Sequence, residues 1–332
     1  MTAFAKGHGT ENDFVLLPDG DGRLDLTPDL VRALCDRQAG IGADGVLRVV
    51  RVDASAEARA LEAAVSETDG AAPVWFMDHR NADGATAQMC GNGIRLFARY
   101  LVDQGWADAG ALPVLTRSGV KMVQVDTGGA GLVTVDMGPA GLPGGEAPTR
   151  SVTIGGRSLP AIEVDMGNPH VVAFLDSPET IGDVDALDAL DALDLTAEPV
   201  VEPGFPDGVN VEIVVRRGAR HVAMRVHERG VGETRSCGTG ACAVMVASAV
   251  RDRQESKASG VVDAQRDGSS RYVVEVPGGR LAVTRRSDGH LELTGPAVVV
   301  AHGDVDLGAL GSAALVENTR DAVGSGVSPW SG

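Results

Sequence analysis

The 332-residue chain contains very few lysines. Only three occur, Lys6, Lys121 and Lys257, and 46 acidic residues outweigh 29 lysines and arginines to give a formal net charge of −17. Nucleic acids and anionic membrane surfaces attract clusters of basic side chains, which this sequence lacks. The composition therefore argues against nucleic acid and against a membrane surface as partners.

Long apolar runs and a secretion signal are also missing from the sequence. No stretch reaches the roughly eighteen apolar residues that a membrane span needs, and residues 1–10 do not show the basic-then-apolar order of a signal peptide. With 43% hydrophobic residues, the chain is long enough to build substantial cores. We therefore expect a soluble, cytoplasmic protein.

Cysteine is scarce, with four residues in the whole chain: Cys35, Cys90, Cys237 and Cys242. This number is too small for a disulfide framework, and the spacings do not match a zinc site. Cys35 and Cys242 are predicted to be small buried residues. No metal is expected. Cys90 and Cys237 differ from the other two because they share an unusual sequence setting.

That shared setting is a glycine-rich turn followed by an apolar run, MCGNG at 89–93 and SCGTG at 236–240. Apolar residues follow the first turn at helical spacing, Ile94, Phe97, Ala98 and Leu101, and the second run, 241–247, is apolar on every face. Each cysteine is thus predicted to precede a buried helix. Unpaired N–H groups at such a position lower a thiol's pKa from its free value of about 8.5.

The two cysteines also belong to a longer internal repeat. Asn12 and Asn168 each lead into a strand-like apolar run, at similar distances before Cys90 and Cys237. Aligning the two cysteines places Asn81 opposite Glu228. Three coincidences in the same order indicate two similar halves related by a pseudo-two-fold axis.

The fold class predicted from this repeat is α/β (α+β). Short strands between glycine turns indicate mostly antiparallel sheet. We expect two pseudo-symmetric halves, each containing mostly antiparallel sheet and one of the two predicted helices, with the active site in the cleft between them. The N-terminal half is predicted over 1–137, with 304–316 returning to it, and the C-terminal half over 138–303. A tail over 317–332 is predicted to be poorly ordered.

A pair of opposed thiols suits racemisation or epimerisation at an α-carbon. One thiolate removes the proton and the other thiol protonates the opposite face, while helix N-termini stabilise the carbanion through its carboxylate. Pyridoxal phosphate, the usual alternative, requires a lysine Schiff base, and none of the three lysines has a phosphate-binding context. The glycine-rich segment 40–45 leads into a strand, unlike a dinucleotide fingerprint. No cofactor is predicted.

The motifs resemble those of the diaminopimelate epimerase family. The resemblance covers residues 4 to about 303 and is carried by GTENDFVLL (9–17), RNADGATAQMCGNGIRLFARYL (80–101), GNPHVV (167–172), VN (209–210) and HERGVGETRSCGTGACA (227–243). It implies cofactor-independent epimerisation of LL-diaminopimelate to the meso form, in lysine and peptidoglycan precursor synthesis. It also implies two α/β halves, each wrapping sheet around a central helix, and a homodimer.

The resemblance further implies roles for individual residues. Cys90 and Cys237 would transfer the proton, with Cys90 as the base that acts on the LL isomer, and His170 and Glu228 would assist thiol ionisation. Arg229 would bind the distal carboxylate. The residues implied in substrate binding are Asn12, Asn81, Asn168, Asn210, Glu228 and Arg229, with backbone N–H groups of Gly91, Asn92, Gly238 and Thr239. Taken singly, His170 reads as a structural histidine and the asparagines as turn residues.

The sequence departs from the usual family pattern at three positions. Glu11 stands where the first motif commonly has glycine, Gly45 where some members have a glutamine that contacts substrate, and His227 where tyrosine is frequent. These differences concern the distal end of the substrate. The segments 53–72 and 178–198 are predicted to be exposed, partly helical insertions without an assigned function.

Two alternatives are considered. A proline or hydroxyproline racemase-type enzyme would share the fold, but that group typically has histidine at the position of Asn92, and proline has no second carboxylate for Arg229. A thiol redox-switch protein would instead work through a disulfide between Cys90 and Cys237. Epimerisation requires both thiols to be reduced.

Overall fold

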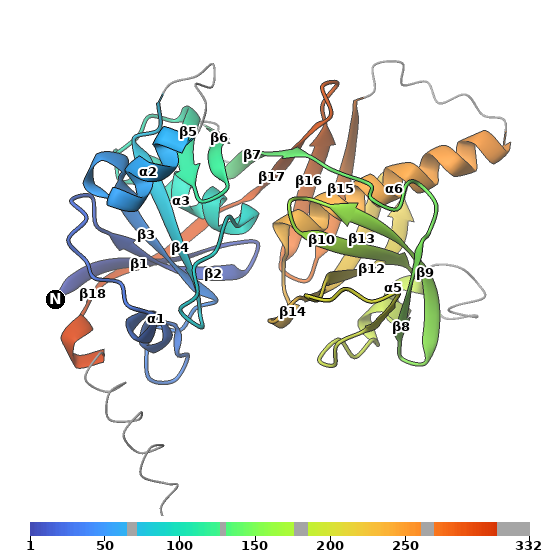
Figure 1. Ribbon diagram of the computed structural model, residues 1–332, viewed down its shortest axis with the longest axis horizontal. Helices are drawn as coiled ribbons and strands as arrows, with labels where there is room; N and C mark the ends of the chain where they lie inside the picture. The colour runs from blue at the N-terminus through green and yellow to red at the C-terminus, as the bar shows by residue number, and fades with distance from the viewer. Residues whose placement is uncertain (65–71, 127–130, 176–184, 260–268, 311–332) are drawn as a thin grey trace, which may run out of the picture.

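The computed structural model describes residues 1–64, 72–126, 131–175, 185–259 and 269–310. Two α/β halves lie side by side, and the strands β7 and β17 run between them (Figure 1). Each half is a sheet wrapped around one long helix, α3 in the first half and α6 in the second. No helix in the described ranges is long and apolar enough to cross a membrane.

The first half is one continuous ladder of strands. Its strands pair in the order β18-β1-β2-β3-β4-β5-β6-β7, and only the pairs β2–β3 and β4–β5 are parallel. The elements are β1 (Thr2–Gly9), β2 (Asn12–Pro18), α1 (Pro28–Cys35), β3 (Gly45–Arg51), the 3-10 turn η1 (Val52–Ala54), α2 (Ala56–Ala64), β4 (Trp75–Asn81), α3 (Gly91–Asp103), β5 (Gly110–Thr116), β6 (Gly119–Val125), β7 (Leu132–Pro139) and β18 (Val298–Val305).

The second half repeats this arrangement. Its strands pair in the order β11-β8-β9-β10-β12-β13-β15-β16-β17, and again two pairs are parallel, β10–β12 and β13–β15. The elements are β8 (Arg150–Ile154), β9 (Arg157–Asp165), β10 (Pro169–Phe174), α5 (Ala186–Asp191), β11 (Val200–Glu202), β12 (Asn210–Gly218), β13 (His221–Glu228), β14 (Gly232–Thr234), α6 (Gly238–Ser259), β15 (Ser270–Val276), β16 (Gly279–Arg285) and β17 (His290–Pro296).

The strand registers confirm the internal repeat. In the first half Gly45 lies between Phe14 of β2 and Asn81 of β4. In the second half Asn210 pairs with His170 of β10, and the next residue of β12 pairs with the residue before Glu228. Asn81 and Glu228 therefore occupy equivalent strand ends, as the aligned cysteines predict.

The equivalent strands β7 and β17 pair with each other in antiparallel fashion, and this pairing joins the two sheets. Val135 lies opposite Leu293, and the hydroxyls of Thr134 and Thr294 lie 2.8 Å apart. Buried side chains of this ladder pack together with those of α3 and α6 in one hydrophobic cluster. Two equivalent strands that pair in antiparallel fashion are related by a two-fold axis. The structure therefore confirms the prediction of two pseudo-symmetric α/β halves.

The central helices form where the apolar spacing predicts them. In α3 the side chains of Ile94, Phe97, Ala98 and Leu101 are all fully buried. In α6 every residue from Gly240 to Val250 is buried, and the helix continues to Ser259 with an exposed end. A helix that is buried on all sides has no need of a polar face, which agrees with the apolar run in α6. Both helix starts are thus held in the interior, between the two halves.

The structure bears on one predicted boundary and on the two predicted insertions. The return of the chain to the first half begins at β18, which pairs with β1 from Val298 onward, ahead of the predicted 304. Of the predicted insertions, 53–72 contains α2 and 178–198 contains α5, while 65–71 and 176–184 lie outside the described residues. The predicted tail, 317–332, also lies outside them. The division at 137 and 138 stays a prediction.

Candidate active site

The two cysteines hold identical positions at the starts of the central helices. Cys90 is the N-cap of α3, and its Sγ accepts a hydrogen bond from the N–H of Gly93 at 3.4 Å. The Sγ of Cys237 accepts one from the N–H of Gly240 at 3.3 Å. Each sulfur therefore receives one of the unpaired N–H groups of a helix N-terminus. All four cysteines are free thiols.

The two helix starts meet at glycines. A Cβ placed on Gly238 would lie 3.1 Å from the Cα of Gly91 and 3.1 Å from Cδ2 of Leu293. A Cβ on Gly91 would lie 3.0 Å from the same leucine atom. Such contacts are tighter than most Cβ contacts, so a side chain here would require its neighbours to shift, and glycine allows the approach without that shift. Two positive helix ends thereby converge beside the two cysteines.

The thiol pKa values differ from the sequence prediction. Burial raises the pKa of Cys90 and raises that of Cys237 well above its usual value, and the carboxylate of Glu228 raises both further. Hydrogen bonds from the helix N–H groups lower each pKa only in part. The predicted lowering was wrong because desolvation of the thiolate outweighs the helix terminus. At neutral pH both thiols favour the protonated form.

Asn12 gives the Cys90 thiol an acceptor for its proton. The Nδ2 of Asn12 donates to Asp44 at 2.8 Å, which turns its Oδ1 toward the sulfur, 3.6 Å away. Because a carboxylate can only accept, Asp44 fixes this orientation of the amide. The sequence analysis did not single out Asp44, which stands in a glycine-rich loop with the composition of an ordinary turn.

Asn92 connects the two halves through its side chain. Its Nδ2 donates to the carbonyl oxygen of Ser236 at 2.9 Å and lies 3.3 Å from Oδ1 of Asn12. The residue is 1% exposed. The sequence predicted a role for its backbone N–H alone. The structure adds a bridge from the start of one helix to the residue before Cys237.

Glu228 and Thr239 surround the second thiol. The hydroxyl of Thr239 lies 3.4 Å from Sγ of Cys237, and Glu228 hydrogen-bonds both this thiol and the hydroxyl of Thr234. Burial raises the pKa of Glu228, and the nearby Glu212 raises it further. The carboxyl group thus lies beside the thiol, as predicted, in a setting that favours its neutral form.

His170 is fully buried, and both of its ring nitrogens are occupied. Nδ1 lies 2.7 Å from Oε1 of Glu212, and Nε2 lies 3.1 Å from Oδ1 of Asn168. The sequence predicted that His170 acts on a thiol, but these two contacts are to other groups. Glu212 was missed. It could have been found in the sequence as the single acidic residue within the apolar run of β12.

The remaining predicted ligands lie at strand ends of both halves. Asn210 donates to the carbonyl oxygen of Pro169 at 3.1 Å and accepts from the N–H of Arg229 at 3.0 Å, so its side chain supports the backbone. The guanidinium of Arg229 is exposed and contacts the carbonyl oxygen of Asp207 at 3.4 Å. Within the described ranges no carboxylate pairs with it. Asn81 ends β4.

Known proteins identify the family. A family model for diaminopimelate epimerase matches residues 4–143 and 162–300. The chain is 53% identical over 306 residues to diaminopimelate epimerase of Streptomyces coelicolor, an alignment that covers 92% of this chain and 95% of the relative. It is 48% identical over 309 residues to that of Rhodococcus opacus, with 91% and 96% covered. The chain belongs to the diaminopimelate epimerase family.

Solved structures share the fold of this family member at much lower identity. A phenazine biosynthesis protein of the PhzF family from Bacillus anthracis aligns with a TM-score of 0.61 at 16% identity, over 92% of this chain and 99% of that one. A probable proline racemase from Agrobacterium radiobacter aligns with a TM-score of 0.56 at 14% identity, over 92% and 93%. The predicted family resemblance and fold class are both confirmed.

The three departures from the family pattern have structural explanations. A Cβ at Gly45 would lie 2.6 Å from the carbonyl oxygen of Arg80, which leaves no space for the glutamine of other members. Glu11 forms an ion pair with Arg235 of the other half. His227 is buried and its Nδ1 lies 3.0 Å from the carbonyl oxygen of Leu195. None of the three contacts Cys90 or Cys237.

No group of three or more histidine, cysteine or acidic side chains in the described ranges is arranged to hold a metal ion. The polar groups around the cysteines include amides, hydroxyls, the carboxyls of Glu228 and Glu212 and the guanidinium of Arg95. They can donate and accept hydrogen bonds to a charged small molecule and can exchange protons with it.

Proposed function

We propose that the chain interconverts LL- and meso-diaminopimelate by two-base proton transfer without a cofactor. One observation carries the proposal: two cysteines, each capping a buried helix in the same way, lie at the place where the two helix starts meet. A reaction that inverts one carbon needs acid and base groups on opposite faces. Two pseudo-symmetric halves supply one such group each.

In the proposed mechanism the thiolate of Cys90 takes the α-proton of the LL isomer. The electron pair of the broken C–H bond is delocalised into the α-carboxylate, and the Cys237 thiol then gives its proton to the opposite face. The thiolate and the thiol have exchanged places at the end, so the reverse reaction uses the same pair. Backbone N–H groups of Gly91, Asn92, Gly238 and Thr239 would hold the carboxylate, where developing charge is best stabilised.

The raised thiol pKa values require a way to form the first thiolate. Glu228 hydrogen-bonds Cys237 and, when ionised, can accept a proton from it, which would form the thiolate that starts the reverse reaction from the meso isomer. The substrate carboxylate would be placed at the two helix ends, and its ammonium group would add a positive charge near the thiols. That charge favours a thiolate. His170 would act with Glu212 by orienting Asn168 toward the substrate.

The far end of the substrate would be bound by Arg229. Its exposed guanidinium has no carboxylate partner within the described ranges, and its backbone N–H is held by Asn210. A guanidinium binds a carboxylate through two parallel hydrogen bonds. This residue separates the proposal from a proline racemase-type activity, because proline has no second carboxylate.

Incubation in deuterium oxide tests the proposal directly. With LL-diaminopimelate we expect the meso isomer to form with deuterium at one α-carbon, followed by NMR, and Cys90→Ala and Cys237→Ala to abolish turnover. Cys35→Ala is the matched control, because Cys35 is a buried thiol outside the site. Turnover in either site variant, or exchange of L-proline instead, would contradict the mechanism. Activation by an oxidant would favour a redox switch.

The same proposal places the enzyme in the biosynthesis of lysine and peptidoglycan precursors. A cytoplasmic location and a homodimer go with it. Sedimentation of the purified chain tests the homodimer, and a monomer that retains full activity would contradict that part.

A further inference from the structure

Arg95 is a buried cation that no step above uses. It lies on α3, one turn beyond Cys90, and its side chain is fully buried. Its NH1 donates to the carbonyl oxygen of Gly91 at 3.1 Å, and its NH2 donates to Thr10 Oγ1 at 2.7 Å and to Asn92 Oδ1 at 3.0 Å. All three acceptors are neutral, and the Nε atom has no partner.

No carboxylate of the described residues forms an ion pair with Arg95. From α6 the neutral thiol of Cys242 faces it, and from β17 Gly295 packs against it so closely that a Cβ there would lie 3.3 Å from Cζ. Burial lowers the pKa of Arg95 to about 10, so the guanidinium is still charged at neutral pH. Burying a cation without a counter-ion is costly. This cost points to a role for the charge at this place.

The guanidinium decides which way the Asn92 amide faces. Because Arg95 can only donate, it binds the carbonyl oxygen of Asn92, and the amide nitrogen must then point to the carbonyl oxygen of Ser236, 2.9 Å away. Ser236 directly precedes Cys237. A continuous chain of contacts therefore runs from Thr10 through Arg95 and Asn92 to the start of the second helix.

Arg95 also makes the two halves electrostatically unequal. The charge of Glu228 acts on both thiols, whereas that of Arg95 acts on Cys90 and that of Glu212 on Cys237. Arg95 binds the carbonyl oxygen of Gly91, the residue after Cys90. A Cβ on Gly240 would lie 2.7 Å from Oε1 of Glu212 and 3.3 Å from Sγ of Cys237. Alignment of the two cysteines places Cys242 at the position equivalent to Arg95, so α6 carries no charge there. A nearby cation favours a thiolate and a nearby anion opposes it.

We propose that Arg95 is a positioning residue for the epimerisation, which orients Asn92 as a bridge between the halves and favours the thiolate of Cys90 over that of Cys237. The activity part of this inference rests on the proposed function. The thiolate part does not, because alkylation of each thiol can be followed in the absence of substrate.

The test compares Arg95→Gln, Arg95→Lys and Thr10→Val with Arg99→Gln as the control. Arg99 lies on the same helix and pairs with Asp103 near the surface. Rates of alkylation by iodoacetamide are measured for Cys90 and Cys237 peptides by mass spectrometry across pH, alongside kcat and KM. A shift of one pH unit in a midpoint corresponds to a tenfold change in thiolate at fixed pH below it.

For Arg95→Gln we expect the Cys90 midpoint to move to higher pH with that of Cys237 unmoved, and kcat to fall about tenfold or more with little change in KM. Arg95→Lys should keep the Cys90 midpoint but lower kcat. The single nitrogen of an ammonium cannot reach all three acceptors, which Arg95 contacts through two separate nitrogens. Unchanged kcat in both variants, or equal shifts of both thiols, would overturn the proposal.

If Arg95→Gln does not fold, the proposal is tested by Thr10→Val and Arg95→Lys. Both must lower kcat while Arg99→Gln retains it, and full activity in both would overturn the proposal. The two proposals can also be separated. If the wild-type chain has no epimerase activity, the proposed function is contradicted. If its Cys90 still alkylates at lower pH than Cys237, and a folded Arg95→Gln variant loses this difference, the charge effect of Arg95 is supported.

Discussion

Gly91 and Gly238 touch across the junction of the two halves, with the Cα of one 3.1 Å from where a Cβ of the other would lie. Each glycine is the first residue of a central helix and follows a cysteine directly. The distance between the two thiols is thus tied to the closeness of two backbones. A side chain at Gly238 would press directly on the backbone of Gly91, and one at Gly91 would press on the side chain of Leu293.

We expect Gly238→Ala to lower kcat about tenfold, because the added Cβ requires its neighbours, the start of α3 and Leu293, to shift by a few tenths of an ångström, and catalysis is sensitive to small displacements of the reacting groups. Steady-state assays of meso-diaminopimelate formation measure it. Gly218→Ala is the control, since its Cβ would find its nearest neighbour at 4.0 Å. Equal activity of the two variants would mean that the contact between helix starts does not set the geometry.

Removing the charge of Glu228 should make both thiols easier to ionise. Ionised Glu228 raises the pKa of Cys90 and of Cys237, so Glu228→Gln is expected to move both alkylation midpoints to lower pH. Epimerase activity should fall in the same variant if Glu228 accepts a proton from Cys237. Iodoacetamide labelling across pH provides the measurement, and midpoints that stay in place or rise would contradict the electrostatic account.

Arg229→Met should weaken substrate binding far more than it slows chemistry. A hydrogen-bonded charge contributes about 1.5–3 kcal/mol, which corresponds to an increase in KM of roughly tenfold to a hundredfold. The expected change in kcat is small because the distal carboxylate is remote from the reacting carbon. Arg157→Met, at the first residue of β9, is the control. An unchanged KM would remove Arg229 from the substrate site.

Acid should destabilise the first half through Asp13. Burial by itself raises the pKa of this carboxyl, but hydrogen bonds from Arg37 and Lys6 outweigh it and lower the pKa to about 2. A pKa below the unfolded value of about 3.8 stabilises the fold above that pH, and this contribution is lost as pH falls from about 4 to 2.

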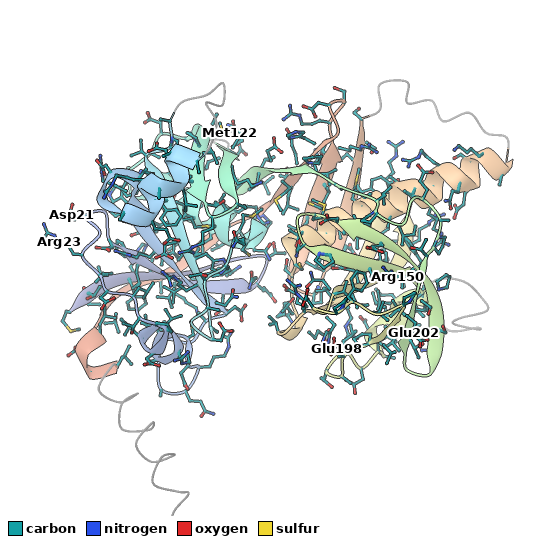
Figure 2. All side chains as sticks on the ribbon, in the orientation of Figure 1. Asp21, Arg23, Met122, Arg150, Glu198 and Glu202 are labelled. Atoms are coloured by element: carbon teal, nitrogen blue, oxygen red, sulfur yellow. The ribbon has the colours of Figure 1, made fainter. Side chains whose placement is uncertain are left out.

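Asp13→Asn should therefore be less stable than wild type at pH 7, with a smaller difference near pH 2. Urea unfolding at several pH values measures it. Asp21→Asn is the control, because Asp21 lies at the outer edge of the first half and is itself exposed in its ion pair with Arg23 (Figure 2). A stability difference between Asp13→Asn and wild type that does not change with pH would contradict the assignment.

The sequence predicted the features that depend on periodicity and repetition. Burial of Ile94, Phe97 and Leu101 follows from spacing alone, and the match of Asn81 with Glu228 follows from aligning two cysteines. Such patterns are local or repeated, so they can be read without knowledge of tertiary contacts. The pseudo-symmetric fold was predictable for that reason.

Long-range contacts were not predictable in the same way. The bridge from Asn92 to Ser236, the contact of His170 with Glu212 and the burial of Arg95 each join residues that only the folded chain brings together. The thiol pKa values show a second limit. A helix start can be recognised in sequence, but the desolvation that outweighs it depends on the packing of both halves.

The unequal surroundings of Cys90 and Cys237 bear on the two directions of catalysis. An enzyme leaves the ratio of LL to meso isomer at equilibrium unchanged, so a charge near one thiol changes kcat/KM in both directions by the same factor, while the separate kcat and KM values for the two isomers can differ. The second half has the uncharged Cys242 at the position equivalent to Arg95, and it has Glu212 near its thiol. We therefore expect the LL and meso isomers to differ in kcat and KM. The pseudo-two-fold axis relates the folds of the halves and leaves the kinetics of the two stereoisomers free to differ.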